Sequence, residues 1–230
     1  MTRHPTARRV HSSRSEPDDA FVARLLELIA WAKRNTRTLV VSGAVLVVAV
    51  AAGFVYVKQQ AAVRDAAQSR LGQIQQTVLI GNNVLAIQDL ESFIVGRTGR
   101  TDAGREGRLL LARLYLEEAR PQDAIRVLEP LASDFGSPYG VPAAFLLAAA
   151  QEEAGDTAGA EETYTRIANR APYEYQKRDA LAATARIRAD AGNYAGATEV
   201  YERLLTMASD DPVERAVYEL RLAEVKAAAN

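Results

Sequence analysis

Cysteine is absent from the sequence, and histidine occurs only twice, as His4 and His11. The lack of cysteine excludes disulfide bonds and thiolate metal sites. Both histidines lie in the polar N-terminal stretch, so the rest of the chain has no imidazole for a catalytic triad, a zinc site or acid–base catalysis near neutral pH. No phosphate-binding glycine loop, nucleophile elbow, HExxH or calcium-loop pattern occurs either. The sequence therefore predicts a non-enzymatic protein with no cofactor and no metal ion.

Paired carboxylates do occur, but only as neighbours in the sequence. Adjacent residues on a helix point about 100° apart, so such pairs do not converge on one substrate and are expected on solvated helix faces. An enzyme that uses only Asp, Glu, Tyr and Arg remains an alternative. The pairs are Glu117 with Glu118, Glu152 with Glu153, and Glu161 with Glu162.

The longest apolar run covers residues 39–57 and contains no charged residue. A helix rises 1.5 Å per residue, so about 20 apolar residues cross the hydrocarbon core of a bilayer. We therefore predict one transmembrane helix at 38–58. The alternatives are a helix buried in a soluble core and the apolar core of a cleaved signal peptide. A signal peptide usually has a shorter apolar core close to the N-terminus, whereas 38 residues precede this run.

Charges on the two sides of this run predict its orientation. Residues 1–37 contain eight Lys or Arg against four Asp or Glu, which favours a cytoplasmic N-terminus. Trp31 and Tyr56 stand near the two ends, where amphipathic rings favour the membrane interface. Residues 58–230 contain 20 basic and 25 acidic residues, so we expect no nucleic acid as a partner.

The segments before and after the run differ in pattern. Residues 1–18 are rich in Arg, Ser and Pro without an apolar period, so we predict a disordered cytoplasmic tail. Residues 19–37 place Phe21, Leu25, Leu28 and Ile29 on one face, which predicts an amphipathic juxtamembrane helix in contact with membrane lipid. This segment could instead join the membrane span as one long helix. Residues 59–230 form the remaining domain.

A repeat of 36 to 38 residues runs through that domain. A small residue recurs once per copy, with large apolar residues four and seven positions later. The small residues are Ala86, Ala124, Ala160 and Ala197. The large residues are Leu90, Leu128, Tyr164 and Tyr201, then Phe93, Leu131, Ile167 and Leu204.

The other repeated positions belong to a helix–turn–helix unit. Twelve residues before each small residue lie Ile74, Ala112, Ala148 and Ala185, and five before it lie Gly81, Ala119, Gly155 and Gly192. Small residues let two helices approach closely, and a glycine ends the first helix. In stacked repeats of this kind no helix pair buries its apolar face alone.

The clearest copies, AGDTAGAEETYTRI and AGNYAGATEVYERL, resemble the second half of a tetratricopeptide repeat. The resemblance implies an all-α fold, in which a single N-terminal transmembrane helix precedes a tetratricopeptide-like α-solenoid. The solenoid is expected to contain about four helix pairs, with residues 212–230 as a C-terminal capping helix.

The resemblance also implies a groove, lined by the first helix of each pair, that binds peptides or partner helices. Arg113, Glu152 and Arg186 could pair with charges of a partner, and the large apolar candidates could anchor it. The lysine- and asparagine-rich set that clamps a terminal carboxylate in chaperone-binding relatives is absent. Counting along the repeat, the groove candidates are Leu109, Arg113, Leu116, Phe145, Ala149, Glu152, Ala182, Arg186 and Ala189.

The order of the parts resembles one particular family. A basic segment ending in WAKRN, one anchor helix, and an Ala- and Gln-rich helix leading into degenerate repeats are similar to the bacterial ancillary Sec-translocon subunit family. The resemblance implies a single-pass inner-membrane protein with a periplasmic repeat domain. Its implied partners are the Sec translocon, a periplasmic prolyl-isomerase chaperone and exported chains. The leading hypothesis is a membrane-anchored scaffold, and the alternative is a self-associating envelope-assembly or septation factor.

Overall fold

The computed structural model describes residues 16–208 and 211–229, and every regular element within those ranges is a helix. The chain divides into two compact units, Met1–Gln60 and Ala61–Asn230. Residues 1–15, which hold most of the predicted tail at 1–18, lie outside the described ranges.

The first unit holds α1 (Glu16–Arg34) and the beginning of α2 (Thr36–Leu79), which are separated by Asn35. The side-chain amide of Asn35 donates a hydrogen bond to the carbonyl of Trp31 at 3.1 Å, and its backbone N–H donates to the same carbonyl at 3.0 Å. A short polar side chain that bonds to the backbone in this way competes with the regular helical pattern. The segment before the apolar run is thus a helix of its own, which begins at Glu16 and ends at Arg34.

The apolar run at 39–57 lies inside α2, and its side chains are exposed, as shown by Leu39 at 41% and Val47 at 68%. By length and composition, α2 is the one helix among the described residues that is suited to cross a membrane. No part of its most apolar window is buried against the rest of the chain. This exposure argues against the alternative of a helix in a soluble core.

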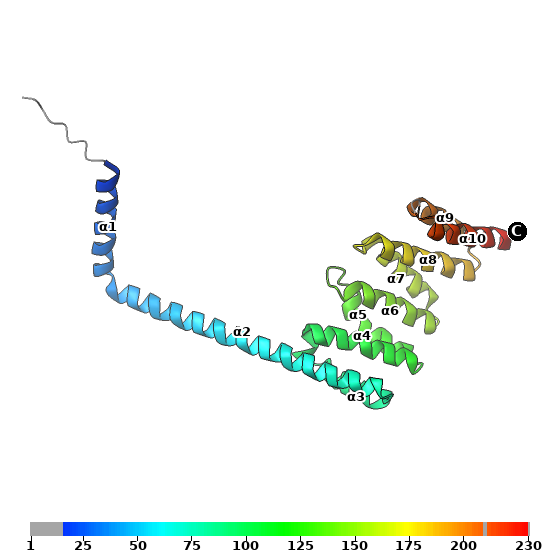
Figure 1. The fold of residues 1–230 in the computed structure, drawn as a ribbon, viewed down its shortest axis with the longest axis horizontal. Coiled ribbons are helices and arrows are strands. Elements are labelled where there is room, and N and C mark those ends of the chain that lie inside the picture. Colours follow the sequence, from blue (N-terminus) through cyan, green and yellow to red (C-terminus); the bar gives the residue numbers. More distant parts are fainter. Residues whose placement is uncertain (1–15, 209–210, 230) are drawn as a thin grey trace, which may run out of the picture. The chain divides into compact units, whose positions relative to one another are not determined.

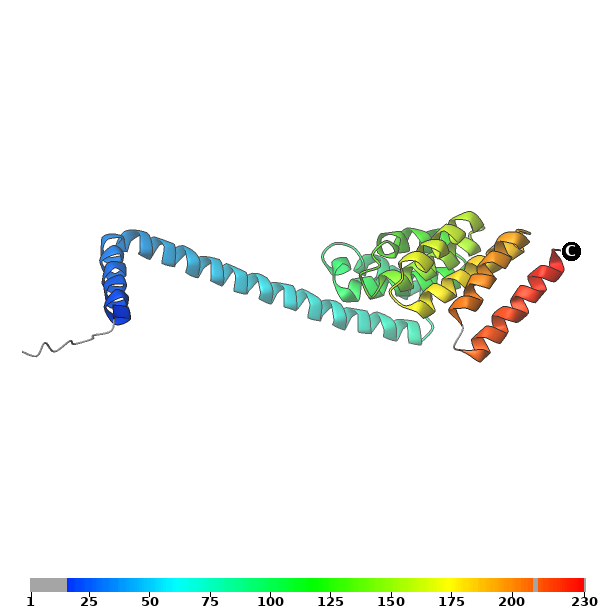
Figure 2. The same ribbon diagram turned by 90° about the horizontal axis from the view of Figure 1, so that it is seen from above.

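In the second unit, α2 supplies the first helix of the first pair. Ala67, Leu71 and Ile74 are buried along one stripe of it, and the Arg70 guanidinium lies over the Phe93 ring of α3 at 5.9 Å from the ring centre. The later pairs follow in chain order, with the short 3-10 helix Thr98–Arg100 before α4 and with α10 at the end (Figures 1 and 2). The pairs are α2 with α3 (Asn83–Phe93), α4 (Asp102–Glu117) with α5 (Pro121–Ala132), α6 (Gly140–Glu153) with α7 (Thr157–Arg170), and α8 (Glu174–Asp190) with α9 (Tyr194–Met207), followed by α10 (Pro212–Ala228).

The repeated residues form the core between these pairs. The four small residues at the shared position, Ala86, Ala124, Ala160 and Ala197, are all 0% exposed. The eight large residues that follow them are between 0% and 8% exposed. Burying one such side chain contributes about 1.5–3 kcal/mol. The predicted all-α solenoid of about four pairs with a capping helix is confirmed, and the first pair forms although Ile74 replaces its small residue.

The turn between the helices of each pair needs a left-handed residue. The φ angles are +80° at Gly81, +79° at Gly155 and +76° at Gly192. The second pair has Ala119 at this position with a φ of +53°, the one positive φ among the described non-glycine residues. Left-handed backbone is costly for a residue with a Cβ atom. All four turns therefore have the same backbone form, although one of them lacks glycine.

Candidate protein-interaction surface

The first helices α4, α6 and α8 carry the candidate groove residues, and the surface of these helices together with α10 is named here the first-helix face. Arg113 is exposed, and no described residue pairs with its guanidinium. Leu116 and Phe145 are half-buried, so each offers part of its apolar surface. Leu109, in contrast, is only 9% exposed and belongs to the core. Of the three large apolar candidates, Leu116 and Phe145 therefore contribute to the surface and Leu109 does not.

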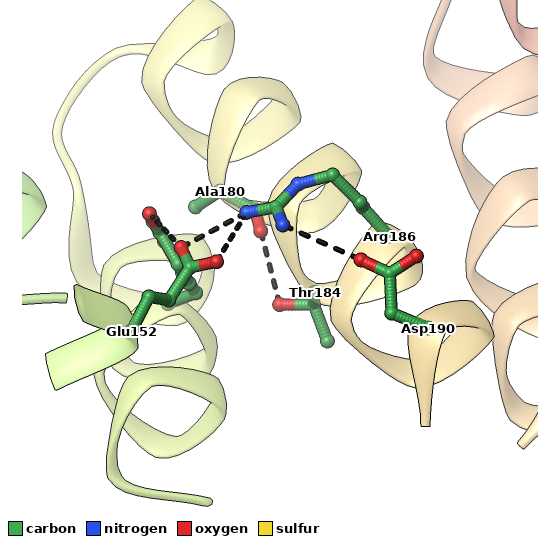
Figure 3. Close-up of polar contacts among 6 residues, drawn as sticks. Glu152, Ala180, Thr184, Arg186 and Asp190 are labelled. Atoms are coloured by element: carbon green, nitrogen blue, oxygen red, sulfur yellow. Dashed lines mark hydrogen bonds and ion pairs between the residues drawn. The ribbon is translucent and has the colours of Figure 1, made fainter. Parts of the chain in front are cut away.

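Two of the candidates bind each other across successive repeats. Nη2 of Arg186 on α8 lies 2.9 and 2.7 Å from the two carboxylate oxygens of Glu152 on α6 (Figure 3). The same carboxylate accepts a hydrogen bond from the Tyr164 hydroxyl at 2.9 Å. A second, longer ion pair of 3.6 Å joins Arg186 to Asp190 (Figure 3). Glu152 and Arg186 thus form a link between repeats.

The electrostatic effects of this link are local. Burial, followed by the hydrogen bond to Glu152, raises the pKa of the Tyr164 hydroxyl. The hydrogen bond to Glu152 is also the main cause that raises the pKa of Arg186. Because the Arg186 side chain is 49% exposed, water screens the ion pair, which contributes about 1 kcal/mol or less. The link fixes geometry more than it adds stability.

A cleft of about 690 Å³ opens beside this link, between α8, α9 and α10. Ala182, Arg186 and Ala189, three of the residues predicted to face the groove, line it from α8. The opposite wall belongs to α10, and the phenol ring of Tyr201 lines the cleft from α9. The lining is a mixture of small apolar residues, aromatic rings and charged groups, which suits a side chain of a partner protein.

Several residues of this cleft were not among the predicted groove residues. Val217 and Arg221 lie on α10, which the sequence identified only as a cap. Tyr201 was assigned to the core by its repeat position, and it is indeed only 5% exposed. One difference between the copies could have identified Tyr201 as a cleft residue. Twelve residues before the tyrosine, the third copy has Glu152 and the fourth has Ala189.

Residues 180–213 match the tetratricopeptide repeat family. The array is tetratricopeptide-like. The matched segment covers most of α8 and all of α9, so it includes one wall of the cleft and Tyr201. A tetratricopeptide-like array is generally a scaffold for protein–protein interaction rather than a catalyst.

Solved structures support the same fold. A putative kinesin light chain from Podosopora anserina with nearly identical TPR-like repeats has a TM-score of 0.56 and 18% identity, over 72% of this chain and 87% of its own. A tetratricopeptide repeat protein from Parabacteroides merdae has a TM-score of 0.57 and 15% identity, over 71% of this chain and 61% of its own. At such identities the similarity shows the fold alone. No curated protein matches the chain.

Proposed function

We propose that this protein is a membrane-anchored scaffold whose tetratricopeptide-like array binds protein partners on the first-helix face. The observation that carries the proposal is the cleft between α8, α9 and α10, which adjoins the Glu152–Arg186 link. The exposed Arg113 lies on α4, further along the same array. The described residues contain no cluster of three or more Asp, Glu or His side chains able to hold a metal ion. Binding is the activity that this geometry supports best.

The anchor is the apolar part of α2, preceded by α1. Its exposed run of valines and leucines has the length of a membrane span, and Lys33 and Arg34 in the last turn of α1 lie on the side predicted to be cytoplasmic. Confinement to a membrane raises the effective concentration of partners there, so weak contacts suffice. We place the array in the periplasm and the N-terminus in the cytoplasm of a bacterial inner membrane.

The partners that we propose are the Sec translocon and a periplasmic prolyl-isomerase chaperone that assist exported chains. This assignment rests on the order of the parts: a basic segment, α1, the apolar run in α2, and the array. The cleft supports it by offering a site for a side chain of a folded chaperone.

Site-specific crosslinking in native membranes tests the scaffold directly. A photoreactive residue replaces Arg113 or Ala182 on the first-helix face, or the exposed Glu129 of α5 as the matched control. Adducts with translocon or periplasmic folding factors are expected from the first two positions and not from the control. Adducts with cytoplasmic proteins would contradict the orientation, and equal adducts from all three positions would contradict a specific face.

The membrane anchor has an independent reporter. Trp31 is the only tryptophan of the chain, and it lies near the end of α1. Its fluorescence should be quenched by lipids brominated near the headgroup when the full chain is reconstituted, and much less by lipids brominated at the chain ends. Equal insensitivity to both lipids would refute the proposed interfacial position.

Self-association is the second candidate, and an apolar stripe on α10 favours it. Val213, Val217 and Leu220 are 74%, 51% and 61% exposed and share one side of the last helix. In an array, such a stripe is what the next repeat would cover. Sedimentation of the detergent-solubilised full chain tests this candidate, because a stable oligomer that Leu220→Lys dissociates would support self-assembly over a free surface.

A further inference from the structure

The third and fourth helix pairs differ at one position that faces the cleft. In the third pair, the Tyr164 hydroxyl donates to Glu152, which lies twelve residues earlier. Tyr201 occupies the equivalent place in the fourth pair, four residues after a fully buried alanine, and Ala189 lies twelve residues before it. The carboxylate that accepts the tyrosine hydrogen bond in one pair is therefore replaced by a methyl group in the next.

The replacement leaves a donor without an acceptor. Tyr201 is 5% exposed, and no described residue accepts a hydrogen bond from its hydroxyl. Its ring and Ala189 both line the cleft, so the space of the missing carboxylate is part of that cleft. The hydroxyl oxygen itself is not fully buried, so water or a ligand that enters the cleft can reach it, and an acceptor on that ligand can take its hydrogen bond.

An arginine from the following helix lies beside both the third and the fourth pair. In the third pair the Glu152 carboxylate is held by Arg186, which comes from the first helix of the next pair. Beside the fourth pair, the next helix is α10, and its Arg221 lines the cleft. Burial is the main cause that raises the pKa of Tyr201, the charges of Arg221 and Arg186 lower it, and those of Glu224 and Asp190 raise it, so Arg221 is one of four charged groups within electrostatic reach of the hydroxyl.

Arg221 is available for a new partner. Its ion pair with Glu224 is 2.9 Å long, joins residues three apart on one helix, and has both side chains more than half exposed. Pairs of this kind are worth little and exchange readily with water or another anion. A hydroxyl donor and a cation are thus present at the cleft, where Arg221 is paired with the exposed Glu224 and no described carboxylate accepts a hydrogen bond from the Tyr201 hydroxyl.

We propose that the cleft between α8, α9 and α10 binds the side-chain carboxylate of an Asp or Glu within a partner segment, held by the Tyr201 hydroxyl and Arg221. The bound group reproduces the Tyr164–Glu152–Arg186 arrangement of the neighbouring pair with a carboxylate from another protein. This proposal rests on the proposed scaffold function and names the chemistry that the scaffold recognises.

The remainder of the cleft specifies what surrounds that carboxylate. Ala182 and Val217 face the cleft from opposite walls, so a short apolar residue next to the acidic one buries its surface there. Two carboxylates, Asp190 and Glu224, also border the cleft, and each pairs with an arginine of its own helix. Asp190 pairs with Arg186, which also holds Glu152, and Glu224 pairs with Arg221. The recognised segment therefore carries one acidic residue beside an apolar one.

The test uses the full chain in detergent micelles and three synthetic peptide pools. Each pool is fluorescein-labelled and about twelve residues long, an extended reach of roughly 40 Å. The first two pools have blocked ends and randomised flanks, and differ only in a central Glu or Gln. The third has a central Gln and a free terminal carboxylate. Retention of each pool by immobilised protein is measured.

The Glu pool should be retained about tenfold more than the Gln pool, as expected for a hydrogen bond to a charged group. Tyr201→Phe keeps the ring and should abolish most of this preference. Ala189→Glu supplies the carboxylate from the chain itself and should also abolish it, while Ala189→Ser should not. The matched control is Tyr115→Phe, which removes a hydroxyl at a distant helix pair.

Three results would overturn the proposal: equal retention of the Glu and Gln pools, an unchanged preference in Tyr201→Phe, or strongest retention of the pool with a free terminal carboxylate. The crosslinking experiment separates this failure from failure of the scaffold itself. If Arg113 and Ala182 yield periplasmic partners but the Glu pool is not preferred, the scaffold stands and the acidic-segment assignment falls.

Discussion

Replacing Ala119 with glycine should stabilise the protein. Ala119 holds a φ of +53° at the turn between α4 and α5, where the other three pairs have glycine. A left-handed conformation costs an alanine about 1–2 kcal/mol, because its Cβ atom approaches the following carbonyl oxygen. Glycine avoids this cost but loses about 0.4–1 kcal/mol through its greater freedom in the unfolded chain. The net gain should be about 0.5–1 kcal/mol.

Gly155→Ala provides the opposite change at the equivalent turn. Gly155 has a φ of +79°, and a Cβ atom built there meets nothing within 4 Å. Its effect therefore comes from the backbone alone, and a loss of about 0.5–1 kcal/mol is expected. Each of these turns joins the two helices of its own pair in the same backbone form. The two variants should therefore change the free energy of unfolding by similar amounts in opposite directions.

Thermal unfolding of the full chain in detergent, followed by its helical circular dichroism, measures both effects. For a chain of this size, 1 kcal/mol corresponds to a shift in Tm of about 2–4 °C. Ala119→Gly should raise Tm by about 2 °C, and Gly155→Ala should lower it by about the same. If Ala119→Gly lowers Tm while Gly155→Ala also lowers it, the turn of the second pair does not depend on left-handed strain and the reasoning is refuted.

Three further outcomes are expected. Leu128→Ala, at a side chain 0% exposed, should cost about 3 kcal/mol in chemical unfolding, whereas Val95→Ala, at 69% exposure, should change stability by about 0.5 kcal/mol or less. A double-mutant cycle of Glu152→Gln and Arg186→Met should give a coupling energy of about 1 kcal/mol or less that shrinks in high salt; a coupling above roughly 2 kcal/mol would contradict the screened geometry. Burial, and then a hydrogen bond to a carboxylate, raise the pKa of Tyr115 from 10.0 to about 12. The folded state thus retains a proton that the unfolded chain releases, so Tm should fall as pH rises from about 10 towards 12, and less steeply in Tyr115→Phe.

The spacing of small and large residues was sufficient to predict the array. Ala124 and Ala160 recur with large residues at fixed distances, and this pattern depends on local helix geometry and on contacts between neighbouring helices. The sequence also identified position 119 as a turn, because the helix pair repeats around it. Even the substitution of Ile74 for a small residue left the first pair intact, since the rest of its stripe is buried.

The site was predictable only in part. Ala182, Arg186 and Ala189 do line the cleft, because residue spacing fixes which side of a helix they occupy. The link between Glu152 and Arg186 was not predicted, since the two residues are far apart in sequence and their contact depends on how long side chains extend between stacked repeats. Arg221 was missed because repeat spacing describes α10 as a cover and does not show that its charged side borders an opening.

The chain contains four helix pairs with the same backbone form. Comparing the residues at equivalent positions of these pairs is therefore like comparing point variants of a single helix pair. At the pair of positions twelve residues apart, the first two versions have Val78 with Leu90 and Leu116 with Leu128. The third has a carboxylate with a phenol, and the fourth has a methyl group with a phenol. Along the array, this pair of positions therefore changes from two apolar side chains, to a hydrogen-bonded carboxylate and phenol, to a phenol beside an alanine. Because each pair keeps its fold, the residues at these two positions can change in the last pair without destabilising the other pairs. The binding specificity of the array can therefore change at its C-terminal end.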